Sequence, residues 1–125
     1  MLKTAIFITF SGNCKKALHF YQTCFGGLLQ FENFEKEMQG YIEMPVVCGS
    51  LVSDSIIIHG SDLVHNEGRK LGNYISIFLH CKDIYDRNEL IEKLEFDPDN
   101  SFVNNYDQKL VEVTDVFDVR WILGI

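Results

Sequence analysis

The sequence predicts an α+β protein in which helices cover one face of antiparallel strands. Three observations predict this class. An apolar run at residues 5–10, a Ser-Gly-Asn turn and a helical stripe that ends at a double glycine form one strand–helix unit. A second strand–helix unit begins about 70 residues later. Segments of strand character follow each unit, so the predicted order is strand, helix and three strands, twice.

The first predicted helix, over residues 13–25, is the element around which the first half is arranged. Its apolar residues step by three and four, as one face of a helix requires: Cys14, Ala17, Leu18, Tyr21 and Phe25. Asn13 is placed to cap the helix, because its side chain can accept a hydrogen bond from a free backbone N–H. Gly26 and Gly27 end the helix, because glycine enters left-handed conformations without steric cost.

The remaining elements follow from short apolar runs and turn residues. Strands are predicted at residues 3–10, 28–35, 46–52, 55–59, 73–81, 101–105, 109–114 and 119–125. Ser53 and Asp54 are predicted to form a tight turn between two of these strands. A second helix is predicted from Lys82 and Asp83 to about Leu94, and a turn at residues 97–100. The apolar stripe of that helix is formed by Ile84, Arg87, Leu90, Ile91 and Leu94.

Length and charge limit the organisation and the partners. A chain of 125 residues is expected to form one domain, with a first module at about 1–60, a linker at about 60–72 and a second module at about 73–125. The net charge of −7 argues against binding to nucleic acids or anionic membranes. Six apolar residues before the Ser-Gly-Asn turn are too few for a signal-peptide core, so a cytoplasmic location is expected.

The four cysteines show no Cys-x-x-Cys pair. Cys14 and Cys24 are ten residues apart on one predicted helix, about 15 Å along its axis, which is too far for a disulfide. Cys14, Cys24, Cys48 and Cys81 are therefore expected to be buried thiols that act as small hydrophobic residues.

The order of elements and five short segments resemble the vicinal oxygen chelate superfamily, the group of glyoxalases, bleomycin-resistance proteins and extradiol dioxygenases, and within it the PhnB-like branch. The segments are Phe10-Ser11-Gly12-Asn13-Cys14, residues 17–27, Asp54-Ser55-Ile56-Ile57, residues 75–83 and residues 115–123. The resemblance implies two βαβββ modules that form a curled mixed sheet around a cleft, usually in a homodimer. In the family this cleft often holds a divalent metal that chelates two substrate oxygens.

The positions that hold the metal in the family carry other residues here. They fall on Ile6, Ile58, Ser76 and Ile122, with His59 as the alternative to Ile58. Isoleucine has no donor atom for a metal. The resemblance therefore implies a cleft without metal or other cofactor, which binds a small molecule and need not be catalytic. The alternative is a metal-dependent lyase or dioxygenase of the same superfamily.

Alternation along the strands predicts which side chains line this cleft. The predicted lining residues are Ile6, Ile8, Phe10, Ser76, Phe78, His80, Arg120 and Ile122. Arg120 suits a carboxylate or phosphate ligand, or else an internal salt bridge with an acidic residue. His80 suits a general base, or else a structural hydrogen bond. Trp121 and Leu123 are predicted to pack on the helix side.

Two further expectations follow from the resemblance. The chain has Asp118 where relatives have glycine before the last strand, so Asp118 is expected in a left-handed conformation. A homodimer is expected, because modules of this type cover their edge strands by pairing within or between chains. Swapped and unswapped dimers both remain open.

Overall fold

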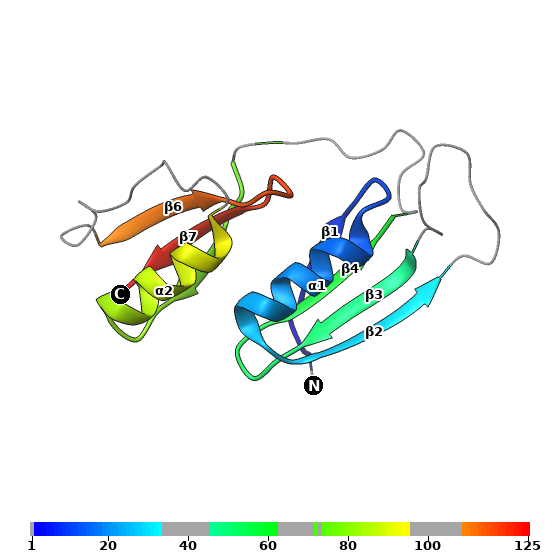
Figure 1. Ribbon diagram of the computed structural model, residues 1–125, viewed down its shortest axis with the longest axis horizontal. Coiled ribbons are helices and arrows are strands. Elements are labelled where there is room, and N and C mark those ends of the chain that lie inside the picture. The colour runs from blue at the N-terminus through cyan, green and yellow to red at the C-terminus, as the bar shows by residue number, and fades with distance from the viewer. Residues whose placement is uncertain (1, 34–45, 63–71, 73, 96–108) are drawn as a thin grey trace. The chain divides into compact units, whose positions relative to one another are not determined.

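The computed structural model describes residues 2–33, 46–62, 72, 74–95 and 109–125. The chain divides into two compact units, residues 1–70 and 71–125, and each is an α+β unit by itself (Figure 1). Most of the predicted linker at 60–72, the predicted turn at 97–100 and the predicted strand at 101–105 lie outside the described residues. The module boundaries therefore stay predictions.

In its described residues, the first unit has one helix and a four-stranded mixed sheet. Its elements are β1 (Ile6–Thr9), α1 (Cys14–Phe25), β2 (Leu28–Asn33), β3 (Val46–Val52) and β4 (Ile57–Ser61). The strand order is β1-β4-β3-β2, in which β1 and β4 are parallel and the other neighbours are antiparallel. This is the predicted βαβββ order.

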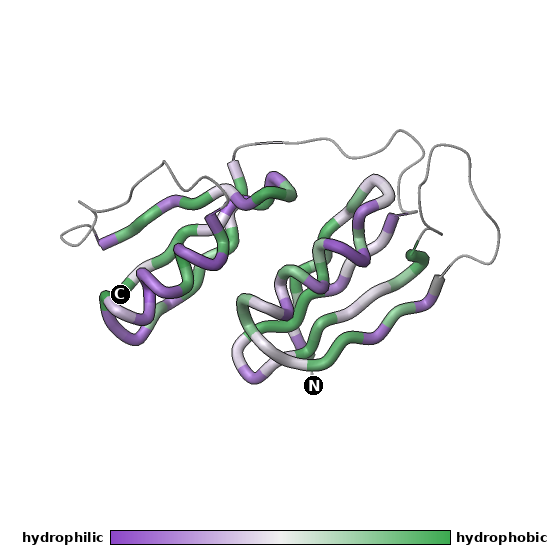
Figure 2. The backbone as a smooth tube through the Cα atoms, in the orientation of Figure 1, coloured by the Kyte–Doolittle hydropathy of each residue, from purple (hydrophilic) through white to green (hydrophobic). Residues whose placement is uncertain are grey.

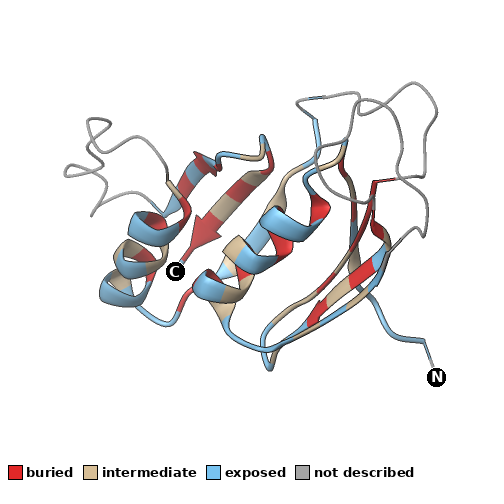
Figure 3. Ribbon diagram, turned by 45° about the vertical axis from the view of Figure 1, so that its right-hand side comes forward, coloured by how far each residue is buried: buried red, intermediate tan, exposed pale blue. Residues whose placement is uncertain are grey.

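Helix α1 buries four of the five residues of the predicted stripe against its own sheet, but Phe25 is only half-buried and Cys24 is buried instead. The buried residues are Cys14, Ala17, Leu18, Tyr21 and Cys24, and they form one side of the helix in Figure 3. Hydrophobic and hydrophilic residues alternate around both helices, as Figure 2 shows. The helix ends at Gly26, whose φ is 73° and whose N–H donates to the Gln22 carbonyl at 2.8 Å.

The capping residue predicted for α1 is wrong. Asn13 occupies the N-cap position, but its side chain makes no capping hydrogen bond. The carboxylate of Asp62, at the end of β4, takes this role from 48 positions away along the chain. Its Oδ1 accepts hydrogen bonds from the backbone N–H groups of Gly12 at 2.8 Å and Cys14 at 3.1 Å. Its Oδ2 accepts from the N–H of Val46 at 2.9 Å, so one buried carboxylate ties together three segments.

The connection between β3 and β4 is longer than the predicted two-residue turn. Val52 pairs with Ile57, which leaves four residues in the loop. The N–H of Ser53 donates to the Ile56 carbonyl at 3.0 Å, and Ser53 Oγ accepts from the N–H groups of Ser55 and Ile56. The serine side chain satisfies the loop backbone, so the turn forms without the glycine or asparagine of a two-residue hairpin.

The described part of the second unit has one helix on a three-stranded mixed sheet. Its elements are β5 (Ile77–His80), α2 (Ile84–Leu94), β6 (Leu110–Thr114) and β7 (Arg120–Gly124). The strand order is β5-β7-β6, with β5 and β7 parallel and β6 and β7 antiparallel. Asp83 caps α2, because its Oδ1 accepts from the Asp86 N–H at 2.8 Å. Arg87, Ile91 and Leu94 of the predicted stripe are buried.

The hairpin between β6 and β7 confirms two predictions. Asp118 has φ 65°, the left-handed conformation expected there. Trp121 is 0% exposed, as the face assignment of the last strand requires.

One cysteine differs from its prediction. Cys14, Cys24 and Cys81 are buried, whereas Cys48 is exposed. Cys48 lies in β3, one residue before the buried Gly49, so alternation along the strand places its side chain on the side away from α1. No helix in the described part of the chain is long and apolar enough to cross a membrane.

Candidate functional site

Each sheet has one face covered by its helix and one face opposite, here called the open face. Two glycines identify the covered face of the first sheet. A Cβ on Gly49 would lie 2.8 Å from Leu18 Cδ1, and a Cβ on Gly60 would lie 2.9 Å from Cys14 Sγ, so both positions face α1. Gly49 and Gly60 are paired in the register of β3 and β4. Alternation from these two positions assigns every other residue of the sheet to a face.

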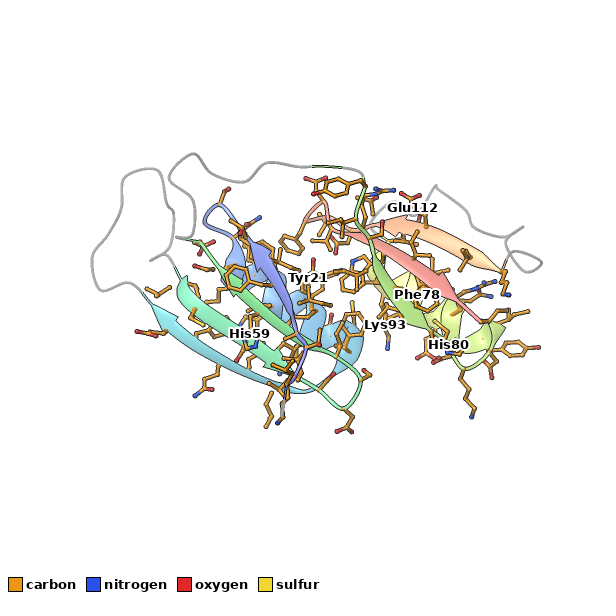
Figure 4. The ribbon with its side chains drawn as sticks, turned by 180° about the vertical axis from the view of Figure 1, so that it is seen from behind. Tyr21, His59, Phe78, His80, Lys93 and Glu112 are labelled. Carbon is orange, nitrogen blue, oxygen red and sulfur yellow. The ribbon has the colours of Figure 1, made fainter. Side chains whose placement is uncertain are left out.

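The open face of the first sheet has a row of in-register side chains across four strands. Phe7 pairs with His59, His59 pairs with Ser50, and Ser50 pairs with Gln30. Phe7 is 54% exposed. Leu28, Val52 and Ile57 lie on the same face and add an apolar region beside this row. In Figure 4, viewed from the side opposite Figure 1, His59 lies on the strands in front of α1.

The face predicted for the first strand is wrong. Ile6 pairs with Ile58 and Ile8 pairs with Gly60, so these three isoleucines lie on the side of the sheet that packs against α1. Ile58 is 0% exposed, and Phe10 is 1% exposed with its ring beside Gly60. Ile6, Ile8 and Phe10 belong to the core of the first unit. The alternative that places His59 on the open face of β4 is the one that matches the register.

A metal does not fit the residues present. His59 has Phe7 and Ser50 as its in-register neighbours, and neither is a typical metal ligand. In the ranges 2–33, 46–62, 74–95 and 109–125, no three His, Cys, Asp or Glu side chains come together as a metal site would require. The described residues of each unit therefore do not assemble the donor set that the family resemblance implies.

The open face of the second sheet brings together four of the predicted lining residues, namely Phe78, His80, Arg120 and Ile122. The pairs Phe78–Ile122, His80–Gly124, Glu112–Ile122 and Thr114–Arg120 fix one common side. The residues of this open face are Phe78, His80, Leu110, Glu112, Thr114, Arg120, Ile122 and Gly124. The opposite side carries Val111, Val113, Trp121 and Leu123, all buried. Ser76 precedes β5 and is half-buried.

Arg120 forms a salt bridge with Glu112 on this open face. Glu112 Oε1 accepts from Arg120 Nε at 3.0 Å and from Arg120 Nη2 at 2.5 Å. The two residues lie diagonally across β6 and β7, where side chains of opposite charge attract. Of the two interpretations of Arg120, the structure supports the internal salt bridge, and the guanidinium is already engaged by an anion.

His80 lies beside an aromatic ring. The centroids of the Phe78 and His80 rings are 6.4 Å apart, with 29° between their planes (labelled in Figure 4). A catalytic base is usually held by a third group that orients its ring. Within the described ranges, no carboxylate is bonded to His80. The geometry thus gives His80 a place on the open face without the partner of a catalytic histidine.

Sequence reasoning did not identify Phe7, Ser50, Glu112 or Leu110 as open-face residues. The signal was present for the first two. Gly49 and Gly60 lie in neighbouring strands, and glycines in strands mark places where another part of the chain approaches closely. Because side chains alternate between faces, every second residue from Gly49 or Gly60 lies on the same face as that glycine, and the residues between lie on the other face. Glu112 and Leu110 follow in the same way from the opposite pattern in β6, where Val111 and Val113 are the buried residues.

The fold of the chain resembles those of several solved structures. Neither the family models nor the curated proteins give a match. Solved structures do. A putative 3-demethylubiquinone-9 3-methyltransferase, a PhnB protein from Bacillus cereus, is 17% identical with a TM-score of 0.71, over 98% of both chains. A protein from Pseudomonas aeruginosa is 20% identical with a TM-score of 0.73, over 99% of this chain and 97% of that one.

A third structure carries the superfamily name. It is a member of the glyoxalase/bleomycin resistance protein/dioxygenase superfamily from Sphaerobacter thermophilus, 21% identical with a TM-score of 0.56, over 99% of this chain and 98% of that one. The fold is that of the vicinal oxygen chelate proteins. At these identities the likeness concerns the vicinal oxygen chelate fold alone.

Proposed function

We propose that the chain binds a small organic molecule on a vicinal oxygen chelate fold that lacks the metal site of the fold's enzymes. The observation that carries this proposal is the composition of the second open face. Phe78 is 58% exposed and Leu110 is 57% exposed, next to Ile122 and three polar side chains. An apolar surface with a few placed polar groups is typical of ligand sites. Ser76, Phe78, His80, Arg120 and Ile122 are the proposed contact residues.

The metal-dependent lyase or dioxygenase is not favoured. Such an enzyme needs three protein ligands with nitrogen or oxygen donors around an open position. The second open face offers Phe78 and Ile122 at its centre, and its one carboxylate, Glu112, is bonded to Arg120. We therefore expect purified protein to contain no stoichiometric zinc, nickel, iron or manganese. Stoichiometric metal that is lost together with binding or turnover after EDTA treatment would contradict the proposal.

Thermal unfolding in the presence of a library of small molecules tests binding itself. A ligand at 100 times its dissociation constant stabilises the native state by about 2.7 kcal/mol, which raises Tm by several degrees. Each hit is then measured with Ile122→Ser, which alters the second open face. Val116→Ser is the control, because Val116 is an exposed aliphatic residue in the β6–β7 loop. Hits that lose their Tm shift in Ile122→Ser alone support the proposal, and the absence of any hit contradicts it.

We also propose that the chain is a homodimer. The two sheets have β1 and β2, and β5 and β6, as the outer strands of their described parts, and apolar outer strands require cover. Closed two-fold dimers are the commonest assemblies of globular proteins. Light scattering after size exclusion should give twice the mass of one chain at micromolar concentration. A mass of one chain would refute the dimer.

A further inference from the structure

The ring of Phe78 lies on the backbone of the neighbouring strand. A Cβ at Gly124 would be 2.9 Å from both Cε2 and Cζ of Phe78, which is closer than carbon atoms can approach. The ring thus occupies the space that any other residue at position 124 would fill. The same point lies 3.3 Å from Leu110 Cδ2, so a second apolar side chain borders the ring. Gly124 is the residue that allows Phe78 to lie against the sheet.

In this position the Phe78 ring is exposed to solvent, but its contacts with the sheet restrict its movement. Phe78 is 58% exposed, although part of its ring is in contact with the sheet. His80 lies alongside with its ring 29° from parallel, which extends the aromatic surface along β5. An aromatic side chain has only two rotatable angles, and here contacts on the sheet restrict them. Such a surface loses little conformational freedom when a second ring stacks on it.

The charges around this surface are already paired. Among the described residues of the second open face, the ionisable side chains are Glu112, Arg120 and His80, and the first two bind each other. A charged ligand would lose its hydration here and would compete with the existing Arg120–Glu112 pair for its charge partner. Arg120 uses only Oε1 of Glu112, and Glu112 is 50% exposed at its side chain. Oε2 is therefore placed to accept a hydrogen bond from a ligand N–H or O–H.

We infer that the ligand of the second open face is a flat, uncharged aromatic molecule that stacks on Phe78 and donates a hydrogen bond to Glu112. Gly124 is the positioning residue, because it seats the ring that the ligand contacts. The inference rests on the proposed function, and it adds the chemical class of the ligand.

Four probes separate the parts of this inference when amide chemical shifts are followed by NMR. Indole has the flat ring and the N–H donor, N-methylindole lacks the donor, indole-3-carboxylate adds a negative charge, and cyclohexanol is saturated. Indole is expected to bind most tightly and to shift the amides of Phe78, Glu112 and Gly124. Tighter binding of indole-3-carboxylate or cyclohexanol than of indole would overturn the inference.

Two variants and a matched control assign the binding to the ring. Phe78→Leu keeps an apolar side chain of similar size and should weaken indole binding about two- to tenfold. Gly124→Ala should weaken it too, because the added methyl group displaces the ring. Phe7→Leu should have no effect, since Phe7 is exposed to a similar extent but lies in the other unit. If Gly124→Ala does not fold, the comparison of indole binding between Phe78→Leu and Phe7→Leu still tests whether the Phe78 ring is the binding surface.

The failures are distinguishable. If probes bind but Phe78→Leu changes nothing, the ligand class is wrong while small-molecule binding stands. If no probe shifts any open-face amide, the ligand class is wrong, whereas small-molecule binding fails only if the thermal-unfolding library also gives no hit. Amide shifts of the second open face that depend on protein concentration alone would show a second copy covering Phe78, and that result would also overturn the inference.

Discussion

The indole of Trp121 donates a hydrogen bond from Nε1 to Oδ2 of Asp115 at 2.8 Å, and both residues are buried. The other carboxylate oxygen of Asp115 accepts from the N–H groups of Phe117 at 2.8 Å and Val119 at 3.1 Å. One carboxylate therefore joins the largest core side chain of the second unit to the loop that turns β6 into β7. The ring has a fixed position because its polar edge has a fixed acceptor.

Asp115→Asn should lower the free energy of unfolding by about 1–3 kcal/mol. The amide group can keep its oxygen toward the two backbone donors, but its NH₂ then faces the indole N–H, which leaves two donors opposed. Trp121→Ala should cost about 3–5 kcal/mol, because it also removes the ring from the core. Urea unfolding at neutral pH measures both. Trp121→Phe is the control that keeps a ring without the donor, and stability equal to wild type in Asp115→Asn would contradict the pairing.

The two glycines after α1 should respond differently to alanine. Gly26 has φ 73° with open space where a Cβ would lie, so Gly26→Ala should cost only backbone strain, about 1–3 kcal/mol. Gly27 has φ 101°, and a Cβ there would lie 2.8 Å from Ser53 Cβ and inside contact distance of the Val52 carbonyl oxygen. Gly27→Ala should cost about 1–3 kcal/mol more. Equal midpoints of the two variants in urea unfolding would contradict this.

One of the four thiols should react rapidly with a thiol reagent in the native protein, and the other three should be protected. Cys48 is exposed, whereas Cys14, Cys24 and Cys81 are buried. Burial and the neighbouring Asp86 raise the pKa of the Cys81 thiol, although Arg87 opposes them, so the reactive thiolate is also suppressed there. Ellman's reagent should therefore modify one thiol rapidly in native protein and four after unfolding in guanidinium.

Cys48→Ser should abolish the fast phase of this reaction, and the matched variant Cys24→Ser should leave it unchanged. A second thiol that reacts as fast as Cys48 in native protein would contradict the burial of the other three.

Stability should decline in alkaline solution because of Cys14. Burial, with smaller contributions from Asp62 and Cys48, raises the pKa of the Cys14 thiol from 9.0 to about 12. Between these values the unfolded chain releases the thiol proton while the folded chain keeps it. The folded state then loses up to about 1.4 kcal/mol of stability for each pH unit, and the full stability is present below pH 9.

Urea unfolding of wild type and Cys14→Ala at pH 7, 9 and 10.5 measures this slope. Other groups titrate in both proteins, so the difference between the two curves belongs to Cys14. It should be constant up to about pH 9 and shrink above it. A difference that does not change with pH would refute the contribution of Cys14.

Local patterns sufficed for much of the fold. Most of the stripe of α1, the start of α2 at Asp83, the face of Trp121 and the left-handed Asp118 all depend on residues within a few positions of each other, where periodicity and backbone sterics act. The faces of β5 and β7 were also predicted, because the resemblance placed Ser76 and Ile122 toward the cleft and alternation along each strand assigned the remaining residues.

The errors concern relationships between segments that are far apart along the chain. The face of β1 depends on its parallel pairing with β4, since Ile6 and Phe7 are equally apolar and neither shows which side meets α1. Asp62 caps α1, and no pattern in the sequence around Asn13 indicates that a distant residue takes this role. At the candidate site, the sequence has many acidic residues that could pair with Arg120, and only the strand register shows that Glu112 lies diagonally opposite it.

The Asp62 carboxylate also sets an order of events when the chain is made. A ribosome releases residues 13–25 long before residue 62, so the helical hydrogen bonds of α1 can form early while the N–H groups of Gly12 and Cys14 still bind water. The parallel partner of β1 emerges with the same late segment. Nascent chains that end before Asp62 should therefore hold a helix with a frayed first turn, and the first unit closes cooperatively only when translation has passed this residue.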